Sequence, residues 1–146
     1  MTLGQAYDPE NIFSKIITGT IPSVKVYEDD DVLSFMDAFP QTRGHTLVIP
    51  KAAGATNLLD AEPALLATLI ERTQIITRAI EKALSPDGIR IAQFNGAAAG
   101  QSVFHLHFHI IPVWEGHMEK PHADPSSGMA DAGALEEIAA AIRAAL

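Results

Sequence analysis

Apolar residues recur at helical intervals in three parts of the chain. Near the start they occupy positions 12, 13, 16 and 17, and Asn11 and Gly19 are suitable ends for a short helix. The long segment 62–84 has apolar residues at steps of three or four and runs into a Ser-Pro-Asp-Gly turn. Segment 134–146 has a similar pattern. The spacing therefore predicts a short N-terminal helix, one long helix and a C-terminal helix.

Five other segments alternate between apolar and polar residues or are rich in β-branched residues, which predicts strands. They cover residues 24–28, 32–37, 45–50, 89–95 and 103–112. Three aspartates at 29–31 separate the first two strands and predict a hairpin. Because the joins between strands are short, the pattern favours an α+β fold with an antiparallel sheet over a doubly wound parallel fold.

The composition suits a globular chain and excludes several kinds of chemistry. With 146 residues, 47% of them apolar, the chain is expected to form a single domain over residues 1–146. Lys and Arg number 10 against 18 Asp and Glu, and the net charge of −8 argues against a nucleic acid polymer as partner. The absence of cysteine excludes disulfides, thiolate nucleophiles and Cys-ligated zinc.

No segment has the features of an export signal or a membrane anchor. The first ten residues lack a basic region and an apolar region. No uninterrupted apolar run reaches the roughly 18 residues that a membrane helix needs. We therefore expect a cytoplasmic protein that has no membrane partner.

Three of the six histidines alternate with apolar residues in the last predicted strand. Side chains on a strand point to opposite faces in turn, so one face of this strand would be apolar and would meet the core. The apolar residues are Phe104, Leu106, Phe108 and Ile110. His105, His107 and His109 would line the other face at steps of about 6.5–7 Å. They could form a solvated polar face, a metal site or a centre for phosphate chemistry.

A metal site would need two of these histidines and a further ligand, for which His45 is the candidate. The outer two histidines of a regular strand lie about 13 Å apart, so all three cannot easily converge on one ion. Residues 108–112 also contain no glutamate of the kind that completes a cupin-like site. We therefore expect no metal ligands among these residues.

Phosphate chemistry fits the neighbouring residues better. Imidazole titrates near neutral pH, so it can act as a nucleophile, a hydrogen-bond donor or an acid. Just before the histidines, Gly100, Gln101 and Ser102 offer a backbone N–H, an amide and a hydroxyl to anionic oxygens. His45 follows a glycine at a strand start and could join the same surface. A site of imidazoles and neutral donors does not require a basic protein.

Segment 105–111, His-Leu-His-Phe-His-Ile-Ile, resembles the signature of the histidine triad (HIT) family. Other segments resemble the family in the same order along the chain: 12–17, 21–22, 26–30, Phe35 and Asp37, 44–51, 95–96 and 99–103. The resemblance covers about residues 11–112 and leaves a variable tail over 113–146. It implies a HIT-like fold with a five-stranded antiparallel sheet, and a homodimer with a continuous sheet.

The resemblance also implies hydrolysis or transfer at the α-phosphate of a nucleotide, without a cofactor. His107, the middle histidine, would be the nucleophile that forms a covalent nucleotidyl-histidine. His109 would contact the phosphate and help the leaving group, while His105 and His45 would orient and support His107. Such a covalent step replaces one difficult displacement at phosphorus with two easier ones.

A second group of residues would bind the nucleotide, for which the resemblance favours a purine base. Asp37 would accept hydrogen bonds from the ribose hydroxyls. The phosphate region would be held by Asn95, Gly100, Gln101 and Ser102. The base pocket would be lined by Ile12, Phe13, Ile16 and Phe35. Taken singly, each of these four apolar residues also suits an ordinary hydrophobic core.

The chain departs from the family pattern at several positions. Some members carry two N-terminal cysteines that bind structural zinc together with histidines, and Asn11 and Ser14 stand in those places, so no zinc is expected. Many members have proline where Arg43 stands and arginine where Val113 stands. Phosphoramidates and dinucleoside polyphosphates both stay open as substrates. The alternative function is a nucleotide-binding or protein-interaction module with little catalysis.

Overall fold

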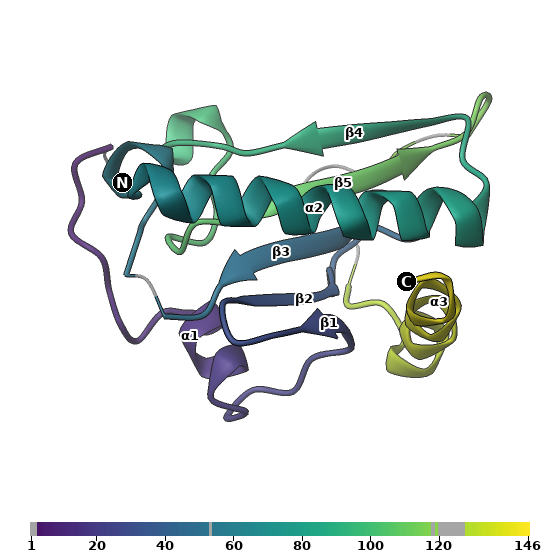
Figure 1. Cartoon of the computed structure of the whole chain (residues 1–146), viewed down its shortest axis with the longest axis horizontal. Coiled ribbons are helices and arrows are strands. Elements are labelled where there is room, and N and C mark those ends of the chain that lie inside the picture. Colours follow the sequence, from purple (N-terminus) through teal and green to yellow (C-terminus); the bar gives the residue numbers. More distant parts are fainter. Residues whose placement is uncertain (1–2, 53, 118, 120–127) are drawn as a thin grey trace.

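The fold is built on one five-stranded antiparallel sheet with the strand order β1-β2-β3-β5-β4 (Figure 1). The computed structural model describes residues 3–52, 54–117, 119 and 128–146. The strands are β1 (Lys25–Glu28), β2 (Val32–Met36), β3 (Thr46–Pro50), β4 (Gly88–Ala92) and β5 (Phe108–Val113). The α-helices are α1 (Ile12–Ile17), α2 (Pro63–Leu84) and α3 (Ala132–Ala145). The expected α+β fold, its antiparallel sheet and the first hairpin are confirmed.

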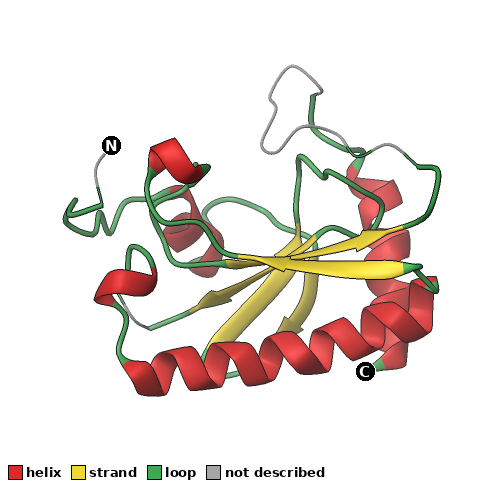
Figure 2. Cartoon of the chain, turned by 90° about the horizontal axis from the view of Figure 1, so that it is seen from above, coloured by secondary structure: helices red, strands yellow, loops and turns green. Residues whose placement is uncertain are grey.

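Helices cover both faces of the sheet. The long helix α2 lies along one face, whereas α1 lies on the opposite side of the sheet (Figure 2). The C-terminal helix α3 packs against α2, β1 and β2. Because both faces are covered, every residue of β2 and of β3 is buried.

Alternation along β2 assigns its side chains to two separate cores. Val32 and Met36 belong to the larger core, which includes the buried side of α2. Leu33 and Phe35 point the other way and pack in a smaller cluster with Phe13 of α1. The face with this smaller cluster is the face on which the polar residues discussed below converge.

The last predicted strand is wrong at its start, because β5 begins only at Phe108 and residues 103–107 form an irregular bend. The N–H of Leu106 donates to the carbonyl of Ala55 at 2.9 Å instead of to a neighbouring strand. Leu106 is nevertheless fully buried, like Ile110, whereas Phe104 and Phe108 are only partly buried. Alternation alone could not distinguish a strand from a bend that is held by hydrogen bonds to other parts of the chain.

Two other expectations concern the segment 89–95 and the C-terminal tail. The strand predicted for 89–95 is shorter, because β4 ends at Ala92 and the side chains of Gln93 and Asn95 bond to each other at 2.9 and 3.0 Å. Within the variable tail expected at 113–146, residues 118 and 120–127 lie outside the described residues. Among the helices in the described ranges, none is both long enough and apolar enough to cross a membrane.

Asp29 connects the β1–β2 hairpin to α2 through hydrogen bonds. Its carboxylate accepts hydrogen bonds from the Tyr27 hydroxyl at 2.6 Å, from Arg72 Nε at 2.7 Å and from the backbone N–H groups of Asp31 and Val32 at 2.8 Å. Burial works against the charged carboxylate, but these hydrogen bonds outweigh it and hold the pKa of Asp29 well below its ordinary value. The ionised form of Asp29 therefore stabilises the folded state.

Replacing Asp29 with asparagine is expected to lower the free energy of unfolding by about 2 kcal/mol near neutral pH, because charge-assisted hydrogen bonds are lost. The folded-state pKa lies below the unfolded value of about 3.9, so the difference from wild type is complete above about pH 5 and shrinks below about pH 4. Urea unfolding at neutral and acid pH measures this difference. The matched control is Asp30→Asn, an exposed neighbour. Equal losses in both variants, or a loss independent of pH, would contradict the prediction.

Candidate active site

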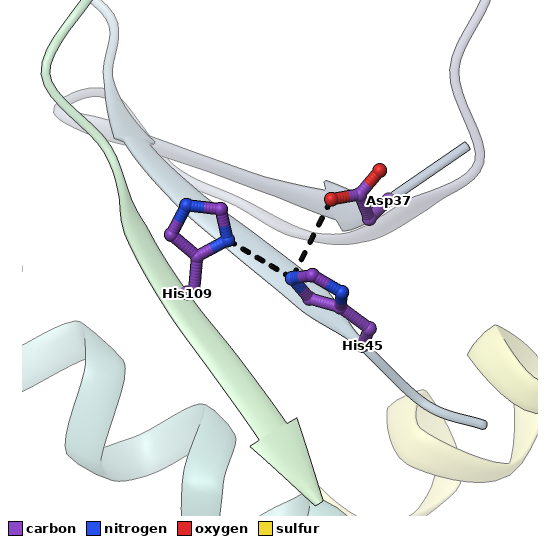
Figure 3. A group of neighbouring side chains, drawn as sticks. All are labelled: Asp37, His45 and His109. Carbon is purple, nitrogen blue, oxygen red and sulfur yellow. Dashed lines mark hydrogen bonds and ion pairs between the residues drawn. The ribbon is translucent and has the colours of Figure 1, made fainter. Parts of the chain in front are cut away.

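Three polar side chains from neighbouring strands meet on the sheet face opposite α2 (Figure 3). Asp37 directly follows β2, His45 directly precedes β3, and His109 lies within β5. His109 is paired with Leu47, which lies two residues beyond His45 and on the same side of β3. Strand register therefore brings together residues that are far apart in the sequence.

His45 is fully buried and connects the other two residues. Its Nδ1 accepts the backbone N–H of Gln41 at 3.0 Å, so the neutral ring carries its hydrogen on Nε2. That Nε2 lies 2.9 Å from Nδ1 of His109 and 3.4 Å from Oδ2 of Asp37 (Figure 3). His45 thus donates to Nδ1 of His109, and the neutral His109 ring must then carry its own hydrogen on Nε2.

The same three residues could also be considered as metal ligands, because one potential ligand atom from each lies within 4.8 Å of the others. The hydrogen bonding argues against this use. A metal ion on Nε2 of His45 would require the ring hydrogen to move to Nδ1, where it would face the N–H of Gln41. The group fits a hydrogen-bonded acid–base chain better than a metal centre.

His107 lies beside this group and is buried. Its Nδ1 is 2.7 Å from the backbone carbonyl oxygen of His105. Because a carbonyl can only accept, Nδ1 carries the hydrogen of the neutral ring and Nε2 carries the lone pair. The ring centroid of His107 lies 4.9 Å from that of His109 and 5.0 Å from that of Phe13, both with edge-on geometry. The bend before β5 therefore brings the imidazoles closer than the steps expected for a regular strand.

His105 is also buried, and its Nε2 donates to the carbonyl oxygen of Pro50 at 2.9 Å. Burial lowers the pKa of His105 below its ordinary value, although the hydrogen bond to Pro50 acts in the opposite direction. The ring is therefore held in its neutral form at neutral pH. Its Nδ1 is the acceptor of a hydrogen bond from the hydroxyl of Tyr7, a residue that the sequence patterns did not single out.

A cavity of about 480 Å³ lies against His107 and His109, a size within the usual range for small-molecule sites. Asp37 and Ser102 contribute to its wall. The four residues predicted for a base pocket line it as well: Ile12, Phe13, Ile16 and Phe35. A smaller cavity of about 330 Å³ beside Arg43 and Trp114 is lined by none of the three triad histidines.

Three of the predicted phosphate-binding residues, all within the described part of the chain, do not line the larger cavity. The amide oxygen of Asn95 accepts the N–H of Leu58 at 2.9 Å. The buried amide of Gln101 accepts the N–H of Gly96 at 2.8 Å and donates to the carbonyl of Thr56 at 2.7 Å. Gly100 has a φ of 107° and ends the short 3-10 helix η2 (Ala97–Ala99). These contacts hold in place the loop that precedes the histidines.

The C-terminal segment supplies a wall of the cavity that the sequence patterns did not predict. The residues are Met129, Ala130, Ala132 and Leu135. The N–H of Ala130 donates to the carbonyl of Ala38 at 2.9 Å, which attaches this segment to the loop after β2. The spacing of apolar residues predicts that one side of the C-terminal helix is buried, but it contains no information about which cavity that side meets.

Comparisons with known proteins are consistent with this geometry. The HIT domain matches residues 18–116. Adenylylsulfatase HINT3 from Arabidopsis thaliana is 44% identical over 101 residues, which cover 69% of this chain and 51% of that protein. The crystal structure of a Hit-like protein involved in cell-cycle regulation from Bartonella henselae, with an unknown ligand, is 53% identical with a TM-score of 0.89, and the match covers 97% of this chain and 100% of that one. A zinc-bound histidine triad family protein from Mycobacterium smegmatis is 38% identical with a TM-score of 0.79, over 93% of this chain and 92% of that one.

Proposed function

The chain belongs to the histidine triad (HIT) family of nucleotide-binding proteins, and on this premise we propose that it is a nucleotide hydrolase or transferase that acts through His107. It cleaves at the α-phosphate of nucleoside phosphoramidates or dinucleoside polyphosphates and forms a covalent nucleotidyl-histidine. One observation carries the proposal. The hydrogen bond of 2.7 Å from Nδ1 of His107 to the carbonyl of His105 leaves the lone pair of the neutral ring on Nε2, beside the cavity.

In the first step, Nε2 of His107 attacks the α-phosphorus while the bond from phosphorus to the leaving nitrogen or oxygen breaks. The attacking ring becomes cationic, and its Nδ1–H keeps its bond to the His105 carbonyl, which stabilises the developing charge. A water molecule then displaces the histidine and releases a nucleoside monophosphate. A neutral nucleophile avoids the repulsion that an anion would meet at a phosphate.

His109 donates a hydrogen bond to the leaving group in this proposal. The chain of hydrogen bonds from Gln41 through His45 puts the hydrogen of the neutral His109 ring on Nε2. This N–H bonds to the leaving amine or phosphate oxygen and stabilises the charge that develops there as the bond to phosphorus breaks. The leaving group takes its proton from solvent, and the entering water returns one to solvent in the second step. His45 acts as a positioning residue, because it fixes the tautomer of His109 from inside the fold.

The nucleoside is bound by the remaining cavity wall. Asp37 uses Oδ1 to accept the N–H of Phe39 at 2.8 Å, and the carboxylate keeps further acceptor sites for ribose hydroxyls. The base lies among the apolar side chains, where Phe13 and Phe35 form an edge-on pair with centroids 5.4 Å apart. A relative named adenylylsulfatase supports an adenylyl group as the part of the substrate that is transferred, in line with a purine base.

The test is a substrate panel with detection of the covalent intermediate. Wild-type protein is mixed with adenosine 5′-phosphoramidate or diadenosine polyphosphates and quenched early, and its intact mass is measured. We expect a mass increase of one adenylyl group and release of AMP. Absence of both with every substrate would overturn the proposal. Tight binding of AMP without adduct or turnover would support the alternative, a nucleotide-binding or protein-interaction module.

We also propose that two copies join along β4 to form a homodimer with a continuous sheet. β4 is an edge strand of the sheet, and its Ile91 is 42% exposed. An apolar edge strand with unused backbone groups is a natural surface for pairing with another strand. Sedimentation velocity should show a dimer for wild type and a shift toward monomer for Ile91→Lys. The control is Leu59→Lys, which alters an exposed side chain of the 3-10 helix Leu58–Asp60, outside β4. A purely monomeric wild type would refute the dimer.

A further inference from the structure

A directional chain of hydrogen bonds ends on the ring of His105. Because Nε2 of His105 donates to Pro50, its Nδ1 must accept, and the Tyr7 hydroxyl at 2.8 Å is a much closer donor than the side-chain amide of Asn11 at 3.5 Å. The Tyr7 oxygen then accepts from the Ser14 hydroxyl at 2.8 Å. Ser14 in turn accepts from the side-chain amide of Asn11 at 3.1 Å. The three residues that lead to His105, which are Tyr7, Asn11 and Ser14, belong to the N-terminal segment and α1.

A zinc-bound histidine triad family protein is 38% identical to this protein, and the resemblance to the family places Asn11 and Ser14 where some members carry zinc-binding cysteines. The residues here do not fit zinc. The sequence contains no cysteine, and Asn11 and Ser14 offer an amide and a hydroxyl in place of thiolates. The Nδ1 lone pair of His105, which a metal ion would need, already accepts the Tyr7 hydroxyl.

We propose that Tyr7 is a positioning residue for the nucleophile, on which it acts through its hydrogen bond to His105. The proposal rests on the proposed function of His107. His105 is held at both ring nitrogens, and its carbonyl holds Nδ1–H of His107. Tyr7 thereby fixes the backbone on which the nucleophile's tautomer depends.

Packing holds the Tyr7 ring in position independently of its hydroxyl. The ring centroid lies 5.6 Å from that of His105. The ring also packs on Gly54, where an added Cβ would lie 3.3 Å from Cδ2 of Tyr7. Tyr7→Phe therefore keeps the ring in place and removes only the hydroxyl, with its bonds to His105 and Ser14.

Tyr7→Phe is expected to lower kcat about five- to tenfold with KM changed less than about twofold, because a buried acceptor loses its close donor and the nucleophile is less well ordered. In the free protein, the ¹⁵N resonance of Nδ1 of His105 should move downfield, toward that of an imidazole nitrogen without a donor. The matched control is Tyr27→Phe, which removes the only other tyrosine hydroxyl and should alter neither kcat nor this resonance. Gly54→Ala puts a Cβ 3.3 Å from Cδ2 of Tyr7 and requires the ring to shift by a few tenths of an ångström. It should act in the same direction as Tyr7→Phe, more weakly, and serves if that variant does not fold.

The outcomes separate this inference from the proposed function. If the wild type shows no adduct and no turnover, the function of His107 fails, while the ¹⁵N resonance still reports the Tyr7 bond. Wild-type kcat and an unmoved resonance in Tyr7→Phe, with only a lower melting temperature, would overturn the positioning role. One zinc per chain retained by wild type after dialysis and lost in His105→Asn would overturn the metal-free arrangement.

Discussion

Replacing His107 with alanine is expected to abolish the nucleotidyl adduct and to lower kcat about 10³-fold or more. The reason is chemical, because Nε2 of His107 is the attacking atom and a water molecule in its place would meet the anionic phosphate without activation. Binding should persist, since the apolar wall and Asp37 are unchanged. Intact mass, single-turnover kinetics and AMP binding by calorimetry measure the three quantities separately.

A matched histidine control is available outside the cavity. His117 is exposed and packs edge-on against Trp114, with centroids 6.4 Å apart, so His117→Ala should leave adduct formation and kcat unchanged. Turnover close to that of wild type in His107→Ala would reject the nucleophile. Loss of turnover in both variants would indicate a general effect on folding.

Replacing Leu106 with alanine should lower the free energy of unfolding by about 3 kcal/mol. Leu106 lies between two histidines of the bend and is completely buried in the core that α2 covers. Its truncation removes apolar contacts and leaves a cavity that rigid neighbours such as Ile76 and Ile110 cannot close fully. Urea unfolding of the wild type and the variant gives the difference directly.

The control for this loss is Leu59→Ala. Leu59 is 66% exposed, so its truncation should change the free energy of unfolding by less than about 0.5 kcal/mol. A loss below about 1 kcal/mol in Leu106→Ala would mean that the surrounding structure collapses onto the space. The position of the bend before β5 would then not depend on the side chain of Leu106.

Much of the fold follows from local patterns in the sequence. The long helix is predicted at 62–84 and found at Pro63–Leu84, because its apolar positions keep a helical period and Pro63 suits its first turn. The hairpin at Asp29–Asp31 is predicted because strand alternation stops there for three acidic residues. The polar residues of the site share one face because alternation assigns Asp37, His45 and His109 the same orientation.

The remainder depends on contacts between distant segments, which spacing does not encode. The bend at 103–107 exists because Leu106 bonds to Ala55, and Tyr7 reaches His105 across 98 positions of sequence. Asn95 and Gln101 have side chains suited to phosphate, but backbone groups of the surrounding loops occupy them. The functional roles assigned to the histidines and to the cavity wall stay predictions, which the variants above test.

The attachment of the C-terminal segment to the cavity links ligand binding to the local stability of α3. Since Met129, Ala130, Ala132 and Leu135 form part of the wall, any molecule that fills the cavity favours the packed state of that helix by mass action. Amide hydrogens of α3 should therefore exchange more slowly when a nucleotide is bound. Those at the centre of the sheet, which helices cover on both faces, exchange only when a larger part of the fold opens, so their exchange should change less. The exchange rate of the C-terminal helix, which is far from the histidines in sequence, thus indicates whether a ligand occupies the cavity beside them.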